Sequence, residues 1–196
     1  MTLLTVWADS DPTTPLLQTP DREIIAAELA AVGVDFEHVE LHVDVPLDAD
    51  QEQVLAAYRE AVDRLSAERG YTLVDVVQLH LNADSPHELT ATAAAARQKF
   101  LSEHTHDEDE IRLFSHGSGV FYLHIGDRVL AVLCTAGDLL SVPALTTHWF
   151  DMGTLPDFTA IRFFRTDDGW VGTFTGSDIA LGFPTFDELQ AVASSA

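Results

Sequence analysis

The stretch His104-Thr105-His106-Asp107-Glu108-Asp109-Glu110, with His148 further along, decides the fold of this chain. Three imidazoles and one carboxylate form a mixed nitrogen and oxygen ligand set, which suits a divalent metal such as Fe, Ni, Mn or Co. On a β-strand, residues two apart point to the same face, so His104 and His106 can reach one ion. Glu110 can join them if the strand continues or bulges slightly, and His148 must come from another strand.

A histidine pair alone is weak support for a metal site, because the chain has 9 histidines and such a pair can arise by chance. Glu110, the β-rich context and His148 strengthen the assignment. Four protein ligands on an octahedral metal leave two positions for a chelating substrate. The pattern therefore favours a catalytic site over a purely structural one.

Composition limits the kinds of protein that this chain can be. At 196 residues and 46% hydrophobic, it can form one domain with a buried core. No apolar run approaches the ~20 residues that span a bilayer, and the first residues do not resemble a signal peptide. Cys134 is the only cysteine, which favours the cytoplasm, and its apolar surroundings indicate inert packing. A net charge of -22 argues against nucleic acid or an anionic membrane as a partner.

Helix and strand signals alternate through residues 1–102. Capping residues and glycines predict three helices: from Thr19-Pro20 to Gly33, from an Asp50/Gln53 capping box to Gly70, and from Ser85-Pro86 with a buried stripe of Leu89, Ala93, Ala96 and Phe100. Short strands are expected near 36–42 and 72–79.

After Glu103 the pattern changes to short β-rich runs, at 119–125, 129–134, 139–142, 160–164 and 170–174. Gly126-Asp127 predicts a two-residue hairpin, and Thr185 with Glu188 predicts a cap on a short terminal helix. Evenly spaced short strands favour a small β-barrel or jelly roll. We expect one domain over 1–196, mainly β (α+β): a helix and strand part (1–102) packed on a metal-binding barrel (103–182), with a tail (183–196).

The order of the ligands resembles the two cupin motifs. The first, H-x-H-x(3)-E-x(6)-G, is matched by His104, His106, Glu110 and Gly117, and the second, G-x(5)-P-x-G-x(2)-H, by Gly137, Pro143 and His148. Gln98 and Leu145 stand where the motifs have glycine. Cupins perform many functions, so this resemblance implies a jelly-roll barrel and a metal but no particular reaction.

A narrower resemblance, to acireductone dioxygenases, runs from roughly residue 3 to residue 182. It is densest in 97–112, 138–144, 148–153, 159–164, 169–170 and 174–180. The chain departs from that family at Thr147, commonly proline there, and in an acidic extension after Ala180.

The resemblance implies a methionine-salvage enzyme that cleaves 1,2-dihydroxy-5-(methylsulfanyl)pent-1-en-3-one with dioxygen. One Fe(2+) per chain would give 4-methylsulfanyl-2-oxobutanoate and formate. One Ni(2+) would give 3-methylsulfanylpropanoate, formate and carbon monoxide. We expect a cytoplasmic monomer that acts on this small acireductone without nucleic acid or membrane, and the sequence does not indicate which metal is bound in the cell.

The resemblance also implies roles for residues beside the ligands. Arg112 would generate the substrate dianion, Glu103 would assist metal incorporation, and Asp109 would transmit local changes. Phe150, two residues after His148, could contact the methylsulfanyl tail. The alternatives are an arginine in solvent or an ion pair, solvated carboxylates, and a core phenylalanine. The other histidines lack ligand partners at a useful spacing and are interpreted as structural or surface residues: His38, His42, His80, His87, His116 and His124.

Two other kinds of protein could carry a similar metal site. A cupin oxygenase or isomerase for a different chelating substrate would share the ligands but lack the His148-Trp-Phe-Asp-Met-Gly153 segment, which is present here. A non-enzymatic cupin often lacks some ligands, whereas all four are present here. Both comparisons favour the dioxygenase.

Overall fold

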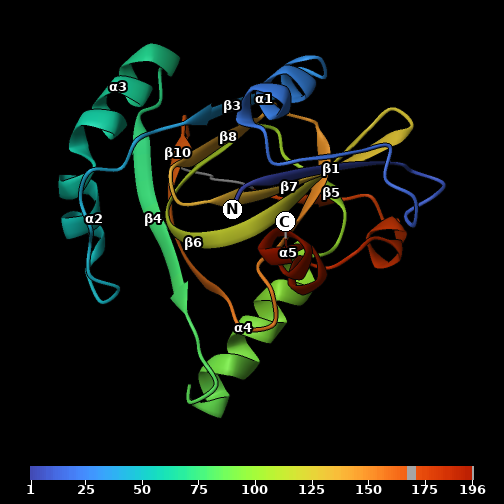
Figure 1. The fold of residues 1–196 in the computed structure, drawn as a ribbon. Coiled ribbons are helices and arrows are strands. Elements are labelled where there is room, and N and C mark those ends of the chain that lie inside the picture. The colour runs from blue at the N-terminus through green and yellow to red at the C-terminus, as the bar shows by residue number, and fades with distance from the viewer. Residues whose placement is uncertain (167–170, 196) are drawn as a thin grey trace.

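The computed structural model describes residues 1–166 and 171–195, and β-strands form its centre (Figure 1). The strands are β1 Leu3–Ala8, β2 Leu17–Thr19, β3 Asp35–His38, β4 Leu73–His80, β5 His104–Thr105, β6 Glu110–Ile125, β7 Arg128–Thr135, β8 Asp138–Val142, β9 Thr147–Asp151, β10 Asp157–Phe164 and β11 Thr173–Phe174. The helices are α1 Arg22–Ala30, α2 Gln51–Ala57, α3 Arg59–Arg69, α4 His87–Phe100 and α5 Phe186–Ser195, with a 3-10 turn at Ile179–Gly182.

The long strand β6 belongs to two sheets. Its second half pairs with β7 and β9 in a sheet ordered β11-β5-β9-β6-β7-β1-β2, and its first half lies between β8 and β10 in a sheet ordered β3-β8-β6-β10-β4. The change occurs near Gly117, which has φ +66°. A Cβ there would lie 1.8 Å from the Asp157 carbonyl oxygen. The close approach of β10 to β6 therefore requires a glycine at position 117. This jelly-roll arrangement, with helices packed on it, confirms the predicted mainly β fold.

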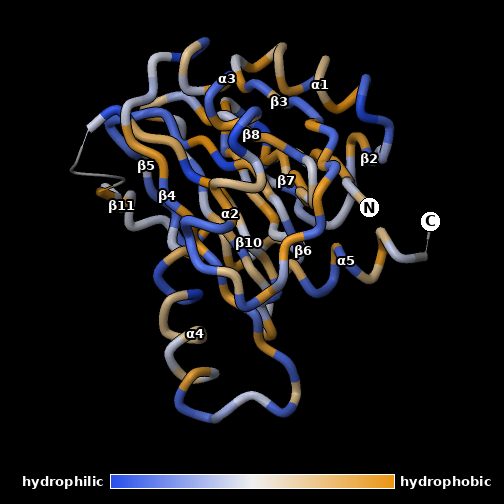
Figure 2. Tube along the Cα trace, turned by 90° about the vertical axis from the view of Figure 1, so that its left-hand side faces the viewer, coloured by the Kyte–Doolittle hydropathy of each residue, from blue (hydrophilic) through white to orange (hydrophobic). Residues whose placement is uncertain are grey.

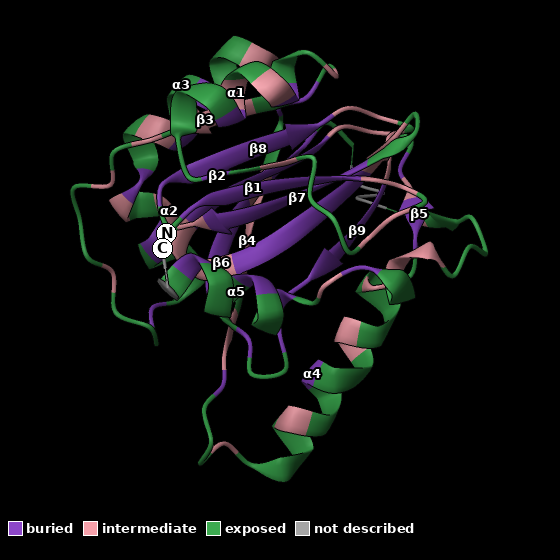
Figure 3. Ribbon diagram, turned by 45° about the vertical axis from the view of Figure 1, so that its right-hand side comes forward, coloured by how far each residue is buried: buried purple, intermediate pink, exposed green. Residues whose placement is uncertain are grey.

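Apolar side chains fill three layers around the two sheets. The space between the sheets holds Phe114, Phe121 and Phe150 among others, and α1 adds Ile25 and Leu29 to it. Outside the first sheet, α5 covers a cluster that includes two tryptophans, and outside the second sheet α2 and α3 cover another. Strands β1 and β6 to β9 are accordingly mostly buried, while the helices show exposed outer faces (Figure 3), and the tube is mostly apolar along the central strands (Figure 2).

The first two predicted helices form, with corrections at their ends. Asp21, not Thr19, caps α1, because its carboxylate accepts hydrogen bonds from the Glu23 and Ile24 amides. The capping box of Asp50 and Gln53 is confirmed at the start of α2. The single helix expected from there to Gly70 is divided into α2 and α3 at Tyr58, where φ and ψ are -107° and 20°.

The third predicted helix, α4, has no side-chain cap, because the Ser85 hydroxyl instead accepts from the Asn82 amide. The expected buried stripe is wrong: Ala93 is buried, but Leu89 is 53% exposed and Phe100 is 36% exposed. The reason is that α4 extends away from the strands (Figure 1), and residues 87–92 of the helix are all exposed or half-buried.

An ion pair attaches α4 to the body of the protein. The Arg97 guanidinium binds the fully buried Asp151 carboxylate through two hydrogen bonds, of 2.6 and 2.9 Å. The same carboxylate also accepts from the backbone amides of Gly153 and Phe186, at the start of α5. Asp151 therefore joins β9, α4 and α5.

The predicted strands differ from the observed ones mainly in their ends. The first is shorter, because β3 ends at His38, whereas the run at 119–125 is only the second half of β6. The hairpin is confirmed, with Ile125 opposite Arg128, and so is the Thr185/Glu188 cap of α5. Strands β1 and β2 were not predicted from the sequence. Trp170, predicted to begin the last strand, lies outside the described residues.

Two expectations from composition can be compared with the fold. Cys134 is fully buried, and burial raises the pKa of its thiol well above the usual value, as expected for an inert packing residue. In the described part of the chain, no helix is both long and apolar enough to span a membrane.

Replacing the capping residue Asp50 by alanine should lower the free energy of unfolding by about 1 kcal/mol, because the Gln53 amide loses its acceptor. Urea denaturation measures the change. Asp48→Ala, which removes the same charge from the exposed turn before α2, is the control and should have little effect. Equal losses in both variants would mean that Asp50 acts through its charge and not as a cap.

Candidate metal centre

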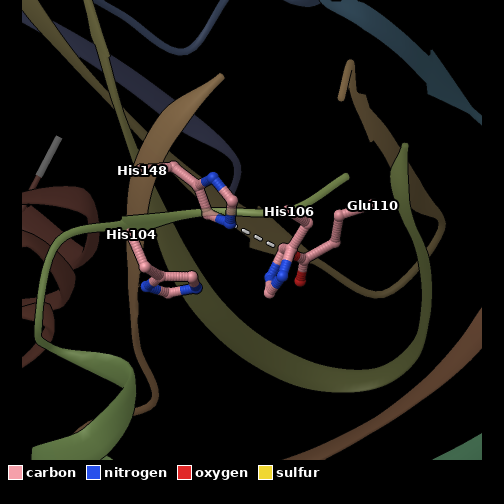
Figure 4. A group of neighbouring side chains, drawn as sticks. All are labelled: His104, His106, Glu110 and His148. Atoms are coloured by element: carbon pink, nitrogen blue, oxygen red, sulfur yellow. Dashed lines mark hydrogen bonds and ion pairs between the residues drawn. The ribbon is translucent and has the colours of Figure 1, made fainter. Parts of the chain in front are cut away.

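Four polar side chains converge between the two sheets at one end of the jelly roll (Figure 4). His104 on β5 is paired with His148 on β9, Glu110 is the first residue of β6, and His106 follows β5. All four are buried, and one ligand atom from each lies within 4.8 Å of the others. The structure thus brings together every residue predicted as a ligand.

The local chain path differs from the expected continuous strand. β5 ends at Thr105, and a bend at Asp107 and Glu108 separates it from β6. His106 and Glu110 therefore reach the same point from either side of this bend. Glu110 shares the inner face of β6 with Arg112 and Phe114, which places its carboxylate inside the jelly roll.

Hydrogen bonds to the main chain orient all three imidazoles. A carbonyl oxygen can only accept, so each Nδ1 carries the proton and leaves Nε2 as the metal-binding atom. The donors and acceptors are His104 to Ser102 (2.7 Å), His148 to Thr146 (2.7 Å) and His106 to Val171 (3.1 Å). Nε2 of His148 and of His106 lies 2.9 and 3.2 Å from the same oxygen of Glu110. This N₃O donor set fits a divalent transition metal.

Burial and charge favour the metal-binding protonation states of Glu110 and His104, but not that of His106. Burial alone would raise the pKa of the Glu110 carboxyl, but Arg112, His106 and His148 hold it well below the usual value. Burial lowers the pKa of His104. Burial also acts to lower the pKa of His106, but the hydrogen bond to Glu110 outweighs it and the net direction is upward. A metal ion that takes the place of this hydrogen bond would release the proton.

The turn between β8 and β9 connects two of the four residues. Leu145 in this turn donates its amide to the His106 carbonyl (2.8 Å), three residues before His148. Its φ is +64°, a left-handed conformation that costs a non-glycine residue roughly 1–2 kcal/mol. Leu145 stands where the cupin motif has glycine, so the structure keeps the motif's backbone despite the different side chain.

Arg112 lies next to the cluster, inside the jelly roll. Its guanidinium is buried, 2.8 Å from a Glu110 oxygen and 4.5 Å from the centre of the Phe150 ring. The alternative of a solvent-exposed arginine is therefore wrong, whereas the ion pair is present. Phe150 packs against Phe121 and Phe158 in the core, as the structural alternative predicts, and it also lines the cavity beside the cluster.

A cavity of about 120 Å³ adjoins the four residues, Arg112 and Phe150. Phe100, Phe174 and Arg162 also line it, and no sequence pattern assigned them to the site. Phe100 and Phe174 lie in segments that carry the family resemblance, which could have drawn attention to them. Arg162 is placed by its register opposite Arg112, which local sequence does not reveal.

Glu103 and Asp109 point away from the cluster. Glu103 is 4% exposed, so it is not a solvated carboxylate: its oxygens accept from His124 (2.7 Å) and Thr175 (2.6 Å). Asp109 accepts from the Ala144 amide (3.0 Å) and the Arg165 guanidinium (2.8 Å), which ties the start of β6 to the turn before β9.

The other histidines need one correction. His80 and His116 were expected to lack ligand partners, but the structure brings both within reach of Asp157. His80, His116 and Asp157 lie on three different strands, so their spacing in the sequence does not indicate that they meet.

Comparisons with known proteins agree on one family. The profile of the ARD/ARD' family matches residues 4–172. Acireductone dioxygenase of Frankia alni is 57% identical over 100% of this chain and 94% of its own length, and that of Saccharopolyspora erythraea is 57% identical over 97% and 99%. The solved acireductone dioxygenase from Bacillus anthracis, with a cadmium ion in its active center, superposes with a TM-score of 0.73 at 24% identity, covering 89% of this chain and 98% of that one, and so shares the fold.

Proposed function

Because the chain belongs to the ARD/ARD' family of acireductone dioxygenases, we propose that His104, His106, Glu110 and His148 hold the single metal ion of a methionine-salvage dioxygenase. The observation that carries this assignment is the convergence of four buried ligand atoms with every imidazole Nδ1 held by a carbonyl. The metal in the active center of the Bacillus anthracis protein supports it. The substrate is 1,2-dihydroxy-5-(methylsulfanyl)pent-1-en-3-one, together with dioxygen.

A divalent metal held by His104, His106, Glu110 and His148 would supply Lewis acidity to the substrate oxygens. The chain itself supplies the surroundings. Arg112, fixed by Glu110, stabilises the doubly deprotonated enediol, since a buried cation favours the ionised form of an acid. Phe150 lies against the Arg112 guanidinium and offers the apolar methylsulfanyl tail a wall. The small cavity limits water around the reacting oxygens.

Two residues beside the ligands have proposed supporting roles. Glu103 assists metal incorporation by anchoring the segment before His104, through its hydrogen bonds to His124 and Thr175. Asp109 transmits local changes, because it joins Glu110 to the turn that leads to His148. In this proposal the 196-residue chain is one domain, with the boundaries given above, and acts as a cytoplasmic monomer. Light scattering of the purified protein measures the last property.

We further propose that the metal is Fe(2+) or Ni(2+) and that the choice determines the products. The N₃O donor set accepts either ion. The experiment loads metal-free protein with one ion or the other, adds the acireductone without oxygen, then admits oxygen and analyses the products. The iron form is expected to give 4-methylsulfanyl-2-oxobutanoate and formate. The nickel form is expected to give 3-methylsulfanylpropanoate, formate and carbon monoxide.

Metal-free protein treated identically corrects for the spontaneous oxidation of the substrate. Carbon monoxide should be confined to the nickel form. Equal yields of carbon monoxide from both forms would contradict the dependence on metal, while leaving the dioxygenase activity itself intact.

A further inference from the structure

A second group of potential ligands lies on the outer side of the sheet that contains β4. His80 ends β4, Asp157 begins β10 directly opposite it, and His116 on β6 is paired with Thr159 of β10. Asp157 and Thr159 are two residues apart on one strand, and cross-strand partners share a face, so all these side chains project to the same side. On this face the apolar layer under α2 and α3, which includes Ile161 and Phe163, gives way to the polar residues Thr159 and Asp157 toward the start of β10.

We propose that His80, His116 and Asp157 form a second divalent-cation site, of the kind that binds Zn²⁺. One Asp157 oxygen lies 2.8 Å from His80 Nδ1 and 3.4 Å from His116 Nε2, and the three ligand atoms lie within 4.8 Å of one another. Zinc bonds of ~2.0–2.1 Å in a tetrahedron place neighbouring ligand atoms roughly 3.3 Å apart. The observed spacing therefore needs only small side-chain movements to admit an ion.

Two contacts hold the ligands in this arrangement. The second ring nitrogen of His80 lies 3.1 Å from the hydroxyl of the buried Thr159, the kind of outer contact that orients a metal-binding imidazole. Gly117, next to His116, permits the close approach of the Asp157 backbone described above, because any side chain there would collide with it. The pair of strands thus fixes His116 relative to Asp157.

The surroundings admit a cation. Asp157 is exposed and the two histidines are partly exposed, so water can complete the coordination of an ion. His116 and Thr159 also line a cavity of about 350 Å³, through which an ion can arrive. The net charge of -22 favours cations generally.

This site is separate from the first centre. His116 lies six residues beyond Glu110 on β6, which corresponds to about 20 Å along an extended strand. An ion there would join the edge strand β4, which pairs only with β10 in the described structure, to both β10 and β6. It would therefore act as a structural clamp and stabilise the folded chain, since the ligands meet only in that state.

The test measures nickel at the first centre and zinc at the proposed second site in the same protein. Full-length protein loaded with Ni²⁺ is dialysed against a low concentration of Zn²⁺ at pH 7.5, and both elements are measured per chain. Wild type should hold one nickel and one zinc. His116→Gln should keep the nickel and lose the zinc, and Thr159→Val should weaken zinc binding about 10–100-fold. His87→Gln, which changes an exposed histidine outside the cluster, should resemble wild type.

The outcomes separate the alternatives. Zinc that enters only by displacing nickel would overturn the proposal, and so would zinc bound equally by wild type and His116→Gln. Retained nickel shows that a variant is folded. If His116→Gln loses nickel as well, His80→Gln takes its place, and the zinc content of that variant decides by the same criterion.

Discussion

Replacing His148 by alanine should leave the protein without its metal ion and without dioxygenase activity. Three donors would remain, and His148 is also one of the two imidazoles within 3.2 Å of Glu110. The loss of metal affinity should exceed the about 10–100-fold that follows removal of an outer hydrogen-bond partner. Elemental analysis for nickel, after loading with Ni²⁺ and dialysis, gives the occupancy of this centre, and oxygen uptake with the acireductone gives the activity. Both should fall to background.

The matched control is His42→Ala, which removes an imidazole that is 78% exposed and far from the cluster in the sequence. It should retain the metal ion of the four-residue centre and full activity. Circular dichroism of both variants tests whether the fold is kept. Full metal occupancy in folded His148→Ala would contradict the assignment of His148 as a ligand.

Arg112→Ala should keep the metal and lose most of the catalytic rate. Arg112 is not a ligand, and Glu110 would still have His106 and His148 to favour its ionised form. Loss of an interaction of ~3 kcal/mol with the reacting dianion corresponds to a rate reduction of roughly 10²-fold. The spectral shift that accompanies substrate deprotonation during anaerobic binding should weaken in the same variant.

The Arg112→Lys variant tests whether a positive charge is sufficient at this position or whether the planar guanidinium is also needed. Lysine supplies a positive charge without the planar group of donors, so it should restore the rate and the spectral shift only in part. Metal content must equal that of wild type in both variants for the comparison to hold. An alanine variant that forms the dianion and turns over like wild type would show that Arg112 has a structural role only.

The metal cluster was predictable because its signals are local. His104, His106 and Glu110 lie within seven residues, and the resemblance to a known family supplied His148. The second cluster was not predictable, because His80, His116 and Asp157 meet through the register of three strands. No pattern within any one of those strands indicates which residues of the others will lie opposite.

Helix α4 shows a different limit of sequence patterns. Leu89, Ala93 and Phe100 recur at helical spacing, which correctly predicts that they lie on one side of a helix. The spacing does not tell whether another element covers that side, and here Leu89 and Phe100 stay exposed. Phe100 instead lines the cavity beside the metal centre. A residue that looked like part of a core therefore belongs to the surroundings of the site.

Some metal ligands depend on contacts with segments that come later in the chain. This order determines when the site can form during protein synthesis. His104 needs β9, which brings His148 beside it, and His106 is oriented by the carbonyl of Val171. Chains are made from the N-terminus, so the first three ligands leave the ribosome long before these partners. A nascent chain that ends before residue 171 has no fully oriented donor set. Metal insertion is therefore a late step, which follows synthesis of nearly the whole jelly roll.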